Sequence, residues 1–230
     1  MLFIIGFMSL LPRLKPSEIT LIFSNILAVF YAIFSYSDQL LIIYVFWGET
    51  AIICAFVFVK MIVVAYYEAC DRSRGENPWM LLYEFLVLLA LPLGFLFMNA
   101  CLLFTSLIII TSILDYGGAF PYSQFSDISR LIAFPVGVFF LSHTMSFFSN
   151  FICLKEYSQF KGTGTHGMAA MMKNPFMRMM SFQVFGIVTA AIVHATMISA
   201  LVPAVMLTFA KTLVDLHYHK EEHSRPLHSG

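Results

Sequence analysis

Charged residues are scarce in this sequence. Lys and Arg contribute 13 residues and Asp and Glu another 13, so that 11% of the chain is charged while 60% is hydrophobic. Soluble domains carry about 25% charged residues, so this composition excludes an ordinary soluble domain. It predicts an integral membrane protein whose first partner is the lipid bilayer. The formal net charge is zero, and without an excess of positive charge no nucleic-acid partner is expected.

Familiar metal-binding and catalytic motifs are also missing. The cysteines form no C-x-x-C pair, which argues against a disulfide framework and against a zinc ribbon. The chain has no H-E-x-x-H, G-x-S-x-G or G-x-x-x-x-G-K-[ST] sequence. It also has no Gly/Ser-rich linker and no internal repeat. A single membrane domain is therefore expected.

The N-terminal stretch MLFIIGFMSLLP is apolar for only about eleven residues, and no basic residue precedes them. A membrane-spanning helix needs about 20 apolar residues, and a signal peptide begins with a basic segment. Residues 1–17 are therefore predicted to form an interfacial segment, with Pro12 ending the apolar run.

Long apolar runs make up most of the remaining chain. The run Trp79–Leu114 is too long for one perpendicular crossing, but no polar break divides it. It is therefore predicted to form one long helix that is tilted or bent at Pro92. The tract Met179–His219 could be one bent helix or a hairpin. The other predicted spans are Glu18–Tyr36, Leu40–Tyr66 and Arg130–Leu154.

The distribution of basic residues decides between these alternatives. Basic residues occur in the N-terminal segment, in the loop after Tyr66, in the loop Lys155–Arg178 and in the tail, whereas the other two loops have none. Because basic loops face the cytoplasm, the number of crossings must be even, with spans at Met179–Ile198 and Pro203–His219. The prediction is an all-α integral membrane bundle of six transmembrane helices over residues 18–219, both termini cytoplasmic, with a cytoplasmic tail at 220–230.

Ionisable residues inside the apolar runs are the candidates for function. The run Val45–Val64 contains Glu49 and Lys60, and a charge in the bilayer costs roughly 2.5–3.5 kcal/mol on insertion scales. At a rise of about 1.5 Å per residue, Glu49, His143 and Lys211 all fall near the middle of the membrane. They are predicted to converge in one polar site and to be its catalytic residues.

The final predicted span contains the sequence KTLVDLHYH. Lys211, Asp215 and His219 recur every four residues in it and so share one helix face. In a structural interpretation Lys211 pairs with Asp215, and His219 marks the boundary with the lipid headgroups. Lys60, near the cytoplasmic end of its span, can extend towards the lipid headgroups or bind Asp215. Because the two residues are expected at a similar depth, a structural ion pair between Lys60 and Asp215 is predicted.

A metal centre is a second interpretation of the same residues. Imidazole and carboxylate ligands together suit zinc or iron, and the candidate ligands are His143, Glu49, Asp215 and His219. For His143, which Ser142 and Ser146 flank, a hydrogen-bonded structural histidine is the alternative.

Three stretches carry a resemblance to a known family. They are FWGETAIICAFVFVKM (Phe46–Met61), FLSHTMSFFSNFICLKEY (Phe140–Tyr157) and KTLVDLHYHKEEH (Lys211–His223). The sequence resembles a prokaryotic family of small multi-pass membrane proteins known only as a domain of unknown function. The shared signatures are W-x-E, S-H-x-x-S-F and K-T-x-x-D-x-x-x-H-x-x-x-H.

The resemblance implies a multi-pass protein in the plasma (inner) membrane of a prokaryote. It also implies histidines at positions that hold Met98, Ser106 and Gln183 here, so this chain would have fewer metal ligands than its relatives. The positions that the resemblance selects are Trp47, Glu49, Lys60, Ser142, His143, Lys211, Asp215, His219 and His223.

Three functions remain open on the sequence alone. The first is a membrane-embedded, metal-dependent enzyme that uses Glu49 as base or ligand. The second is an accessory subunit of a larger membrane complex, in which the ionisable residues pair internally or with another subunit. The third is a proton- or ion-coupled carrier or channel, for which intramembrane Glu, His and Lys residues are suited. The sequence favours the enzyme narrowly.

Overall fold

The computed structural model describes residues 16–34, 41–73, 77–116, 125–160, 163–196 and 201–224. This part of the chain is helical and contains no strand. The helices, in chain order, are α2 (Pro16–Phe34), α3 (Leu41–Arg72), α4 (Pro78–Tyr116), α5 (Phe125–Ser146), the π-helix η3 (Phe147–Cys153), the 3₁₀-helix η4 (Glu156–Phe160), α6 (Gly164–Thr196) and α7 (Leu201–Ser224).

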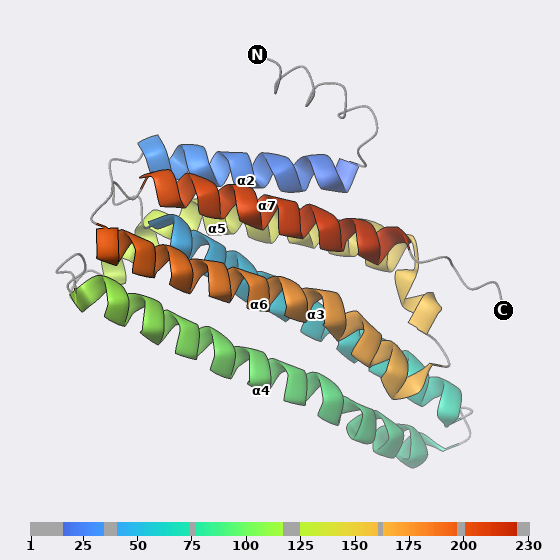
Figure 1. Ribbon diagram of the computed structural model, residues 1–230. Helices are drawn as coiled ribbons and strands as arrows, with labels where there is room; N and C mark the ends of the chain where they lie inside the picture. The colour runs from blue at the N-terminus through green and yellow to red at the C-terminus, as the bar shows by residue number, and fades with distance from the viewer. Residues whose placement is uncertain are drawn as a thin grey trace.

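The helices form a bundle around α3 (Figure 1). Helix α3 packs against α2, α4, α5 and α6, and α7 lies between α2 and α6. Successive helices run in opposite directions, so the first residue of α2 and the last residue of α7 lie at the same end of the bundle (Figure 1). This arrangement follows from the short connections, because neighbouring antiparallel helices need few linking residues.

The core is built on the first turns of α3, where Ile42 to Phe46 are all buried. The ring of Phe46 meets Phe139 of α5 and Phe182 of α6 edge to face, at centroid distances of 6.4 and 6.2 Å. Ala28 of α2 and Leu207 of α7 complete the same cluster. The buried face of α3 therefore meets α2, α5, α6 and α7 at the level of the polar site described below.

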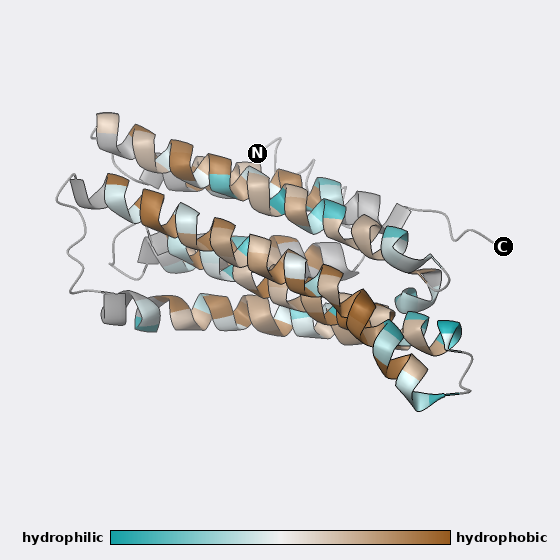
Figure 2. Ribbon diagram, turned by 90° about the horizontal axis from the view of Figure 1, so that it is seen from below, coloured by the Kyte–Doolittle hydropathy of each residue, from teal (hydrophilic) through white to brown (hydrophobic). Residues whose placement is uncertain are grey.

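Four helical segments are long and apolar enough to cross a membrane, among the described residues. They are Ile42–Arg72, Pro78–Ile113, Ile132–Cys153 and Gly164–Ile192. Hydrophobic residues cover most of the length of the helices (Figure 2). Large apolar side chains are exposed on every long helix, including Phe97 of α4 and Met145 of α5. An exposed apolar surface of this extent is suited to lipid rather than to water, which supports a bilayer environment for these helices.

Two sequence-based predictions about helix division are confirmed. The apolar run from Trp79 forms the single helix α4, which contains Pro92 and has 39 residues, about 58 Å of helix. The tract after Met179 is divided between α6, which ends at Thr196, and α7, which begins at Leu201. The number of membrane crossings and the orientation of the termini stay predictions.

The prediction of a loop over Lys155–Arg178 is wrong for most of this segment. Helix α6 begins at Gly164 and runs through Pro175 without interruption. Ala and Met, which favour helix, are frequent between Gly167 and Met172, and one proline can be tolerated in a membrane helix. The consequence is that Arg178 belongs to the bundle and not to a loop.

The boundaries of the other predicted segments differ less. Helix α5 begins at Phe125, five residues before the predicted start of its span. Helix α7 continues to Ser224, into the predicted tail 220–230. Of the predicted interfacial segment 1–17, residues 1–15 lie outside the described residues.

Candidate functional site

Helix α7 supplies two charged residues to the interior of the bundle. Lys211 and Asp215 are both buried, and the Lys211 ammonium donates a hydrogen bond of 2.5 Å to Asp215 Oδ2. Residues four apart on a helix lie on the same face, one turn from each other. The spacing that the sequence shows therefore produces a pair on α7 itself.

Glu49 of α3 is the second partner of Lys211. Its side chain is 1% exposed, and Oε2 lies 2.6 Å from the Lys211 ammonium. The preceding residue, Gly48, allows close approach of α5, because a Cβ atom there would lie 2.8 Å from Cγ2 of Val136. This contact holds α5 against α3 one residue away from Glu49.

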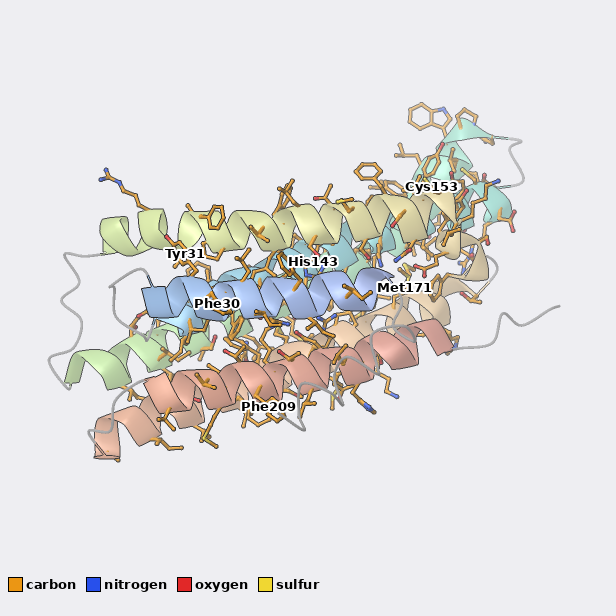
Figure 3. The ribbon with its side chains drawn as sticks, turned by 90° about the horizontal axis from the view of Figure 1, so that it is seen from above. Phe30, Tyr31, His143, Cys153, Met171 and Phe209 are labelled. Atoms are coloured by element: carbon orange, nitrogen blue, oxygen red, sulfur yellow. The ribbon has the colours of Figure 1, made fainter. Side chains whose placement is uncertain are left out.

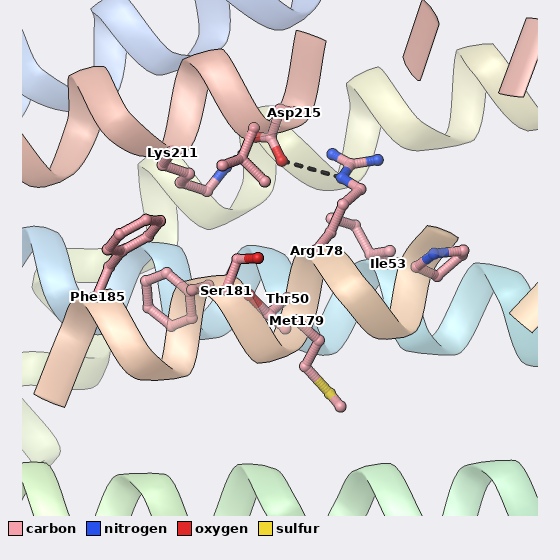
Figure 4. A pocket seen from close by; sticks show the side chains of 11 residues that line it. Thr50, Ile53, Arg178, Met179, Ser181, Phe185, Lys211 and Asp215 are labelled. Atoms are coloured by element: carbon pink, nitrogen blue, oxygen red, sulfur yellow. Dashed lines mark hydrogen bonds and ion pairs between the residues drawn. The ribbon is translucent and has the colours of Figure 1, made fainter. Parts of the chain in front are cut away.

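Arg178 of α6 completes the charge balance, and the sequence analysis missed it as a site residue. Its Nε atom donates a hydrogen bond of 2.9 Å to Asp215 Oδ1, which Figure 4 shows as a dashed line. The site therefore holds two cations, Lys211 and Arg178, and two carboxylates, Glu49 and Asp215. A signal was available in the sequence, because Arg178 stands alone between apolar residues in FMRMMSF.

Asn25 of α2 is a second residue that the sequence analysis missed. It is buried, and its Oδ1 accepts a hydrogen bond of 3.5 Å from Lys211. Asn25 is the only asparagine in α2, and a single amide in an otherwise apolar span would have been the signal. Lys211 therefore contacts polar atoms from α2, α3 and its own helix.

Two aromatic rings border the Lys211 ammonium. It lies 4.8 Å from the ring centroid of Phe46 and 5.8 Å from that of Phe139. Aromatic ring faces attract cations within about 6 Å, so these rings add to the stabilisation that the carboxylates provide. They also place apolar surface on one side of the ammonium, which strengthens its electrostatic contacts.

His143 of α5 approaches Glu49 from the other side. Its Nε2 atom lies 3.8 Å from Glu49 Oε1, and its side chain is 19% exposed. It lies near the middle of the bundle (Figure 3). Among the described residues, neither oxygen of Glu49 accepts a hydrogen bond of normal geometry. Glu49 thus forms a close ion pair with Lys211 through Oε2, while Oε1 faces the imidazole of His143. A protonated His143 would form a second ion pair with Glu49 at this distance.

The space beside these charges is small. A cavity of about 10 Å³ lies between α6 and α7, with room for about one water molecule. Thr50, Arg178, Ser181, Phe185, Lys211 and Asp215 are among the residues that line it (Figure 4). A space of this volume can hold a water molecule but is too small for an organic molecule.

The predicted ion pair between Lys60 and Asp215 does not form. Asp215 is bound by Lys211 and Arg178, and the Lys60 ammonium lies over the ring of Phe151, 5.3 Å from its centroid. The reason is axial register. From the contact between Glu49 and Lys211, Lys60 lies about 16 Å further along α3 but Asp215 only about 6 Å further along α7.

The predicted metal centre finds no support among the described residues. No group of three His, Cys, Asp or Glu residues could hold a metal within the part of the chain that the structure describes. The ammonium of Lys211 contacts both Glu49 and Asp215, which is where a metal bridging the two carboxylates would have to lie. The side chain of His219 lies outside the described residues.

The fold and the site together define a class: an all-helical protein with helices able to span a membrane and a buried, charge-balanced polar centre. Residues 8–230 match a family of unknown function, DUF6498, and the chain belongs to that family. No curated protein and no solved structure matches it. The resemblance to a family of unknown function is thereby confirmed, whereas the prokaryotic origin stays a prediction.

Proposed function

We propose that all six long helices cross the membrane and that both termini are cytoplasmic. The alternation of helix direction supports this topology, since α2 begins and α7 ends at the same end of the bundle (Figure 1). Helices α2 and α7 also present large apolar side chains outward, as Phe30 (54% exposed) and Phe209 (56% exposed) illustrate (Figure 3). The basic loops then face the cytoplasm, in the plasma (inner) membrane of a prokaryote.

Within this topology we propose that the protein is a proton-coupled membrane carrier with Glu49 and His143 as its proton-binding pair. One observation carries the proposal: Glu49 is buried with one oxygen on Lys211 and the other facing His143 at 3.8 Å. Asp215 has two cations at hydrogen-bond distance, but Glu49 has one. Glu49 is therefore the less compensated carboxylate, and the partly exposed His143 gives its proton a route outward.

The central position of Lys211 fits this role. Its ammonium is bound to both carboxylates. Loss of the negative charge on Glu49 would therefore weaken the contact with Glu49 and leave Asp215 as the main partner of Lys211. Asp215 in turn is bound to Arg178 of α6. Protonation of Glu49 would weaken the link between α3 and α7 while leaving α6 and α7 connected. A proton can in this way change how the helices pack, which is what coupling requires.

The enzyme that the sequence favoured would need a larger site. The cavity beside the charges holds about one water molecule, so an organic substrate would require the helices to separate. An accessory subunit is supported by the near-complete mutual pairing of the four charges, because paired intramembrane charges can be purely structural. The distinguishing property is proton binding: a carrier must bind and release a proton at the site, and a structural ion-pair cluster need not.

Charge displacement measured after pH jumps tests the proposal. Proteoliposomes are adsorbed to a solid-supported membrane, and the transient current is recorded with no solute present. We expect wild-type protein to give a saturable transient current, because proton binding within the membrane moves charge. The variants Glu49→Gln and His143→Gln should each reduce the displaced charge about tenfold or more, since either removes one member of the pair.

Glu84→Gln provides the matched control. Glu84 of α4 pairs with Arg72 of α3 at 3.5 Å, away from the site. The Glu84→Gln variant should therefore retain the wild-type current. Size-exclusion chromatography of each variant identifies any that has not folded. A wild-type current no larger than that of empty liposomes would exclude the carrier, as would an undiminished current in folded Glu49→Gln protein.

A further inference from the structure

Lys60 is a half-buried cation of α3 that the polar site does not use. Its ammonium lies over the ring of Phe151 at 5.3 Å, and no carboxylate of the described residues pairs with it. Two of the three acids on α3 are bound to other cations: Glu49 to Lys211, and Glu68 to Arg72. A lysine in a membrane-spanning helix without an acidic partner is costly, so an anion from outside the chain is expected to neutralise it.

The wall opposite Lys60 is the π-helix η3, which continues α5. π-helices are rare and are found frequently at functional sites. Phe147 and Phe151, four residues apart on this segment, are buried and stack at 5.4 Å. Phe151 in turn contacts Tyr157 at 6.0 Å. Helices η3 and η4 therefore present a row of rings to α3, and the Lys60 ammonium lies over one of them, Phe151.

The surface beside Lys60 is apolar and faces outward. Val59 precedes it on α3, and Phe148 and Ile152 stand on either side of Phe151 in the sequence of η3; all three are exposed. Exposed tyrosines follow on α3, Tyr66 and Tyr67, about 9 Å further along the helix axis. Tyrosine is enriched at the level of the lipid headgroups. Lys60 thus lies just below a headgroup boundary, between exposed apolar side chains suited to acyl chains.

We propose that Lys60 binds the phosphate of a negatively charged phospholipid, whose acyl chains lie against Val59, Phe148 and Ile152. The ammonium supplies the charge that a phosphate requires, and lysines near a helix end extend towards the headgroups. The exposed apolar neighbours favour a lipid over free phosphate, because they would remain uncovered if an inorganic ion were bound. In the proposed topology this lipid belongs to the cytoplasmic leaflet, but its binding does not depend on proton coupling.

Titration of delipidated protein in a zwitterionic detergent tests this site. The probes are dioleoyl-phosphatidylglycerol, dioleoyl-phosphatidylcholine and inorganic phosphate, and the readouts are the unfolding temperature and the lipids retained in native mass spectrometry. We expect phosphatidylglycerol to bind and to raise the unfolding temperature of wild-type protein. Lys60→Gln should weaken its apparent affinity about fivefold, since one basic residue near the membrane surface contributes about 1 kcal/mol to anionic lipid binding.

Two further variants serve as controls. Lys60→Arg keeps the cation and should retain phosphatidylglycerol, and Lys173→Gln removes an exposed lysine of α6 and should bind as wild type does. Equal binding of the two phospholipids to wild-type protein would overturn the proposal whether or not Lys60→Gln folds. Full competition by millimolar inorganic phosphate, or an equal loss in Lys173→Gln, would overturn it as well.

Discussion

The contact between Arg178 and Asp215 allows a quantitative test of the buried charge cluster. Arg178→Met removes a cation and leaves Lys211 with two carboxylates, while Asp215→Asn removes a carboxylate and leaves two cations with Glu49. Each variant therefore leaves one uncompensated charge in a site where the side chains of Arg178 and Asp215 are 9% and 4% exposed. The double variant restores neutrality, because Lys211 and Glu49 remain as a pair at 2.6 Å.

The magnitude follows from this geometry. At 2.9 Å and an effective dielectric constant of about 20, two unit charges attract by roughly 6 kcal/mol, most of which offsets the cost of removing them from water. Removing one partner of a buried pair leaves that cost uncompensated, so each single variant should lower the free energy of unfolding by about 3–5 kcal/mol. The double variant should lose less than the two single variants together, with a coupling of about 2–3 kcal/mol.

Reversible unfolding in mixed detergent micelles, followed by tryptophan fluorescence, measures these differences. Trp47 donates a hydrogen bond of 3.0 Å to the carbonyl of Leu103 from a position two residues before Glu49, so its emission should report on packing beside the site. Arg72→Met is the matched control: the Arg72 side chain is 43% exposed against 9% for Arg178, and because solvent screens its ion pairs its loss should be the smaller of the two. Additive single-variant effects, or a loss in Arg178→Met no larger than in Arg72→Met, would refute the reasoning.

Two other predictions concern topology and packing. Reporters fused at successive positions should lie outside after Tyr36 and Tyr116 and inside after Ser73, after Gly164 and at the C-terminus; an external C-terminus would rule out six crossings. Gly48→Ala should lower the free energy of unfolding by about 1–3 kcal/mol, because the added Cβ would lie 2.8 Å from Val136. Combining it with Val136→Ala should recover much of that loss, and a double variant no more stable than Gly48→Ala would show that this contact is not the cause.

Much of the architecture could be predicted from the sequence, because a bilayer imposes simple rules. Few charges and long apolar runs identify membrane helices, and a helix advances a fixed distance per residue. Depth can therefore be estimated from residue number alone. That estimate was enough to group Glu49, His143 and Lys211. In the structure the Glu49 carboxylate lies 3.8 Å from His143 Nε2 and 2.6 Å from the Lys211 ammonium.

Only the tertiary structure decided the partners of Arg178 and Lys60. Arg178 was assigned to a loop because it ends a segment that also contains Lys155, Lys161 and Lys173, yet the continuous helix α6 carries it into the core and onto Asp215. Lys60 was assigned to Asp215 because the starts of two spans were placed by hydropathy, whose boundaries are uncertain by several residues. The actual register is set where Gly48 meets Val136 and Phe46 packs between Phe139 and Phe182. Such side-chain packing fixes the axial offset between helices, and hydropathy along one helix contains no information about that offset.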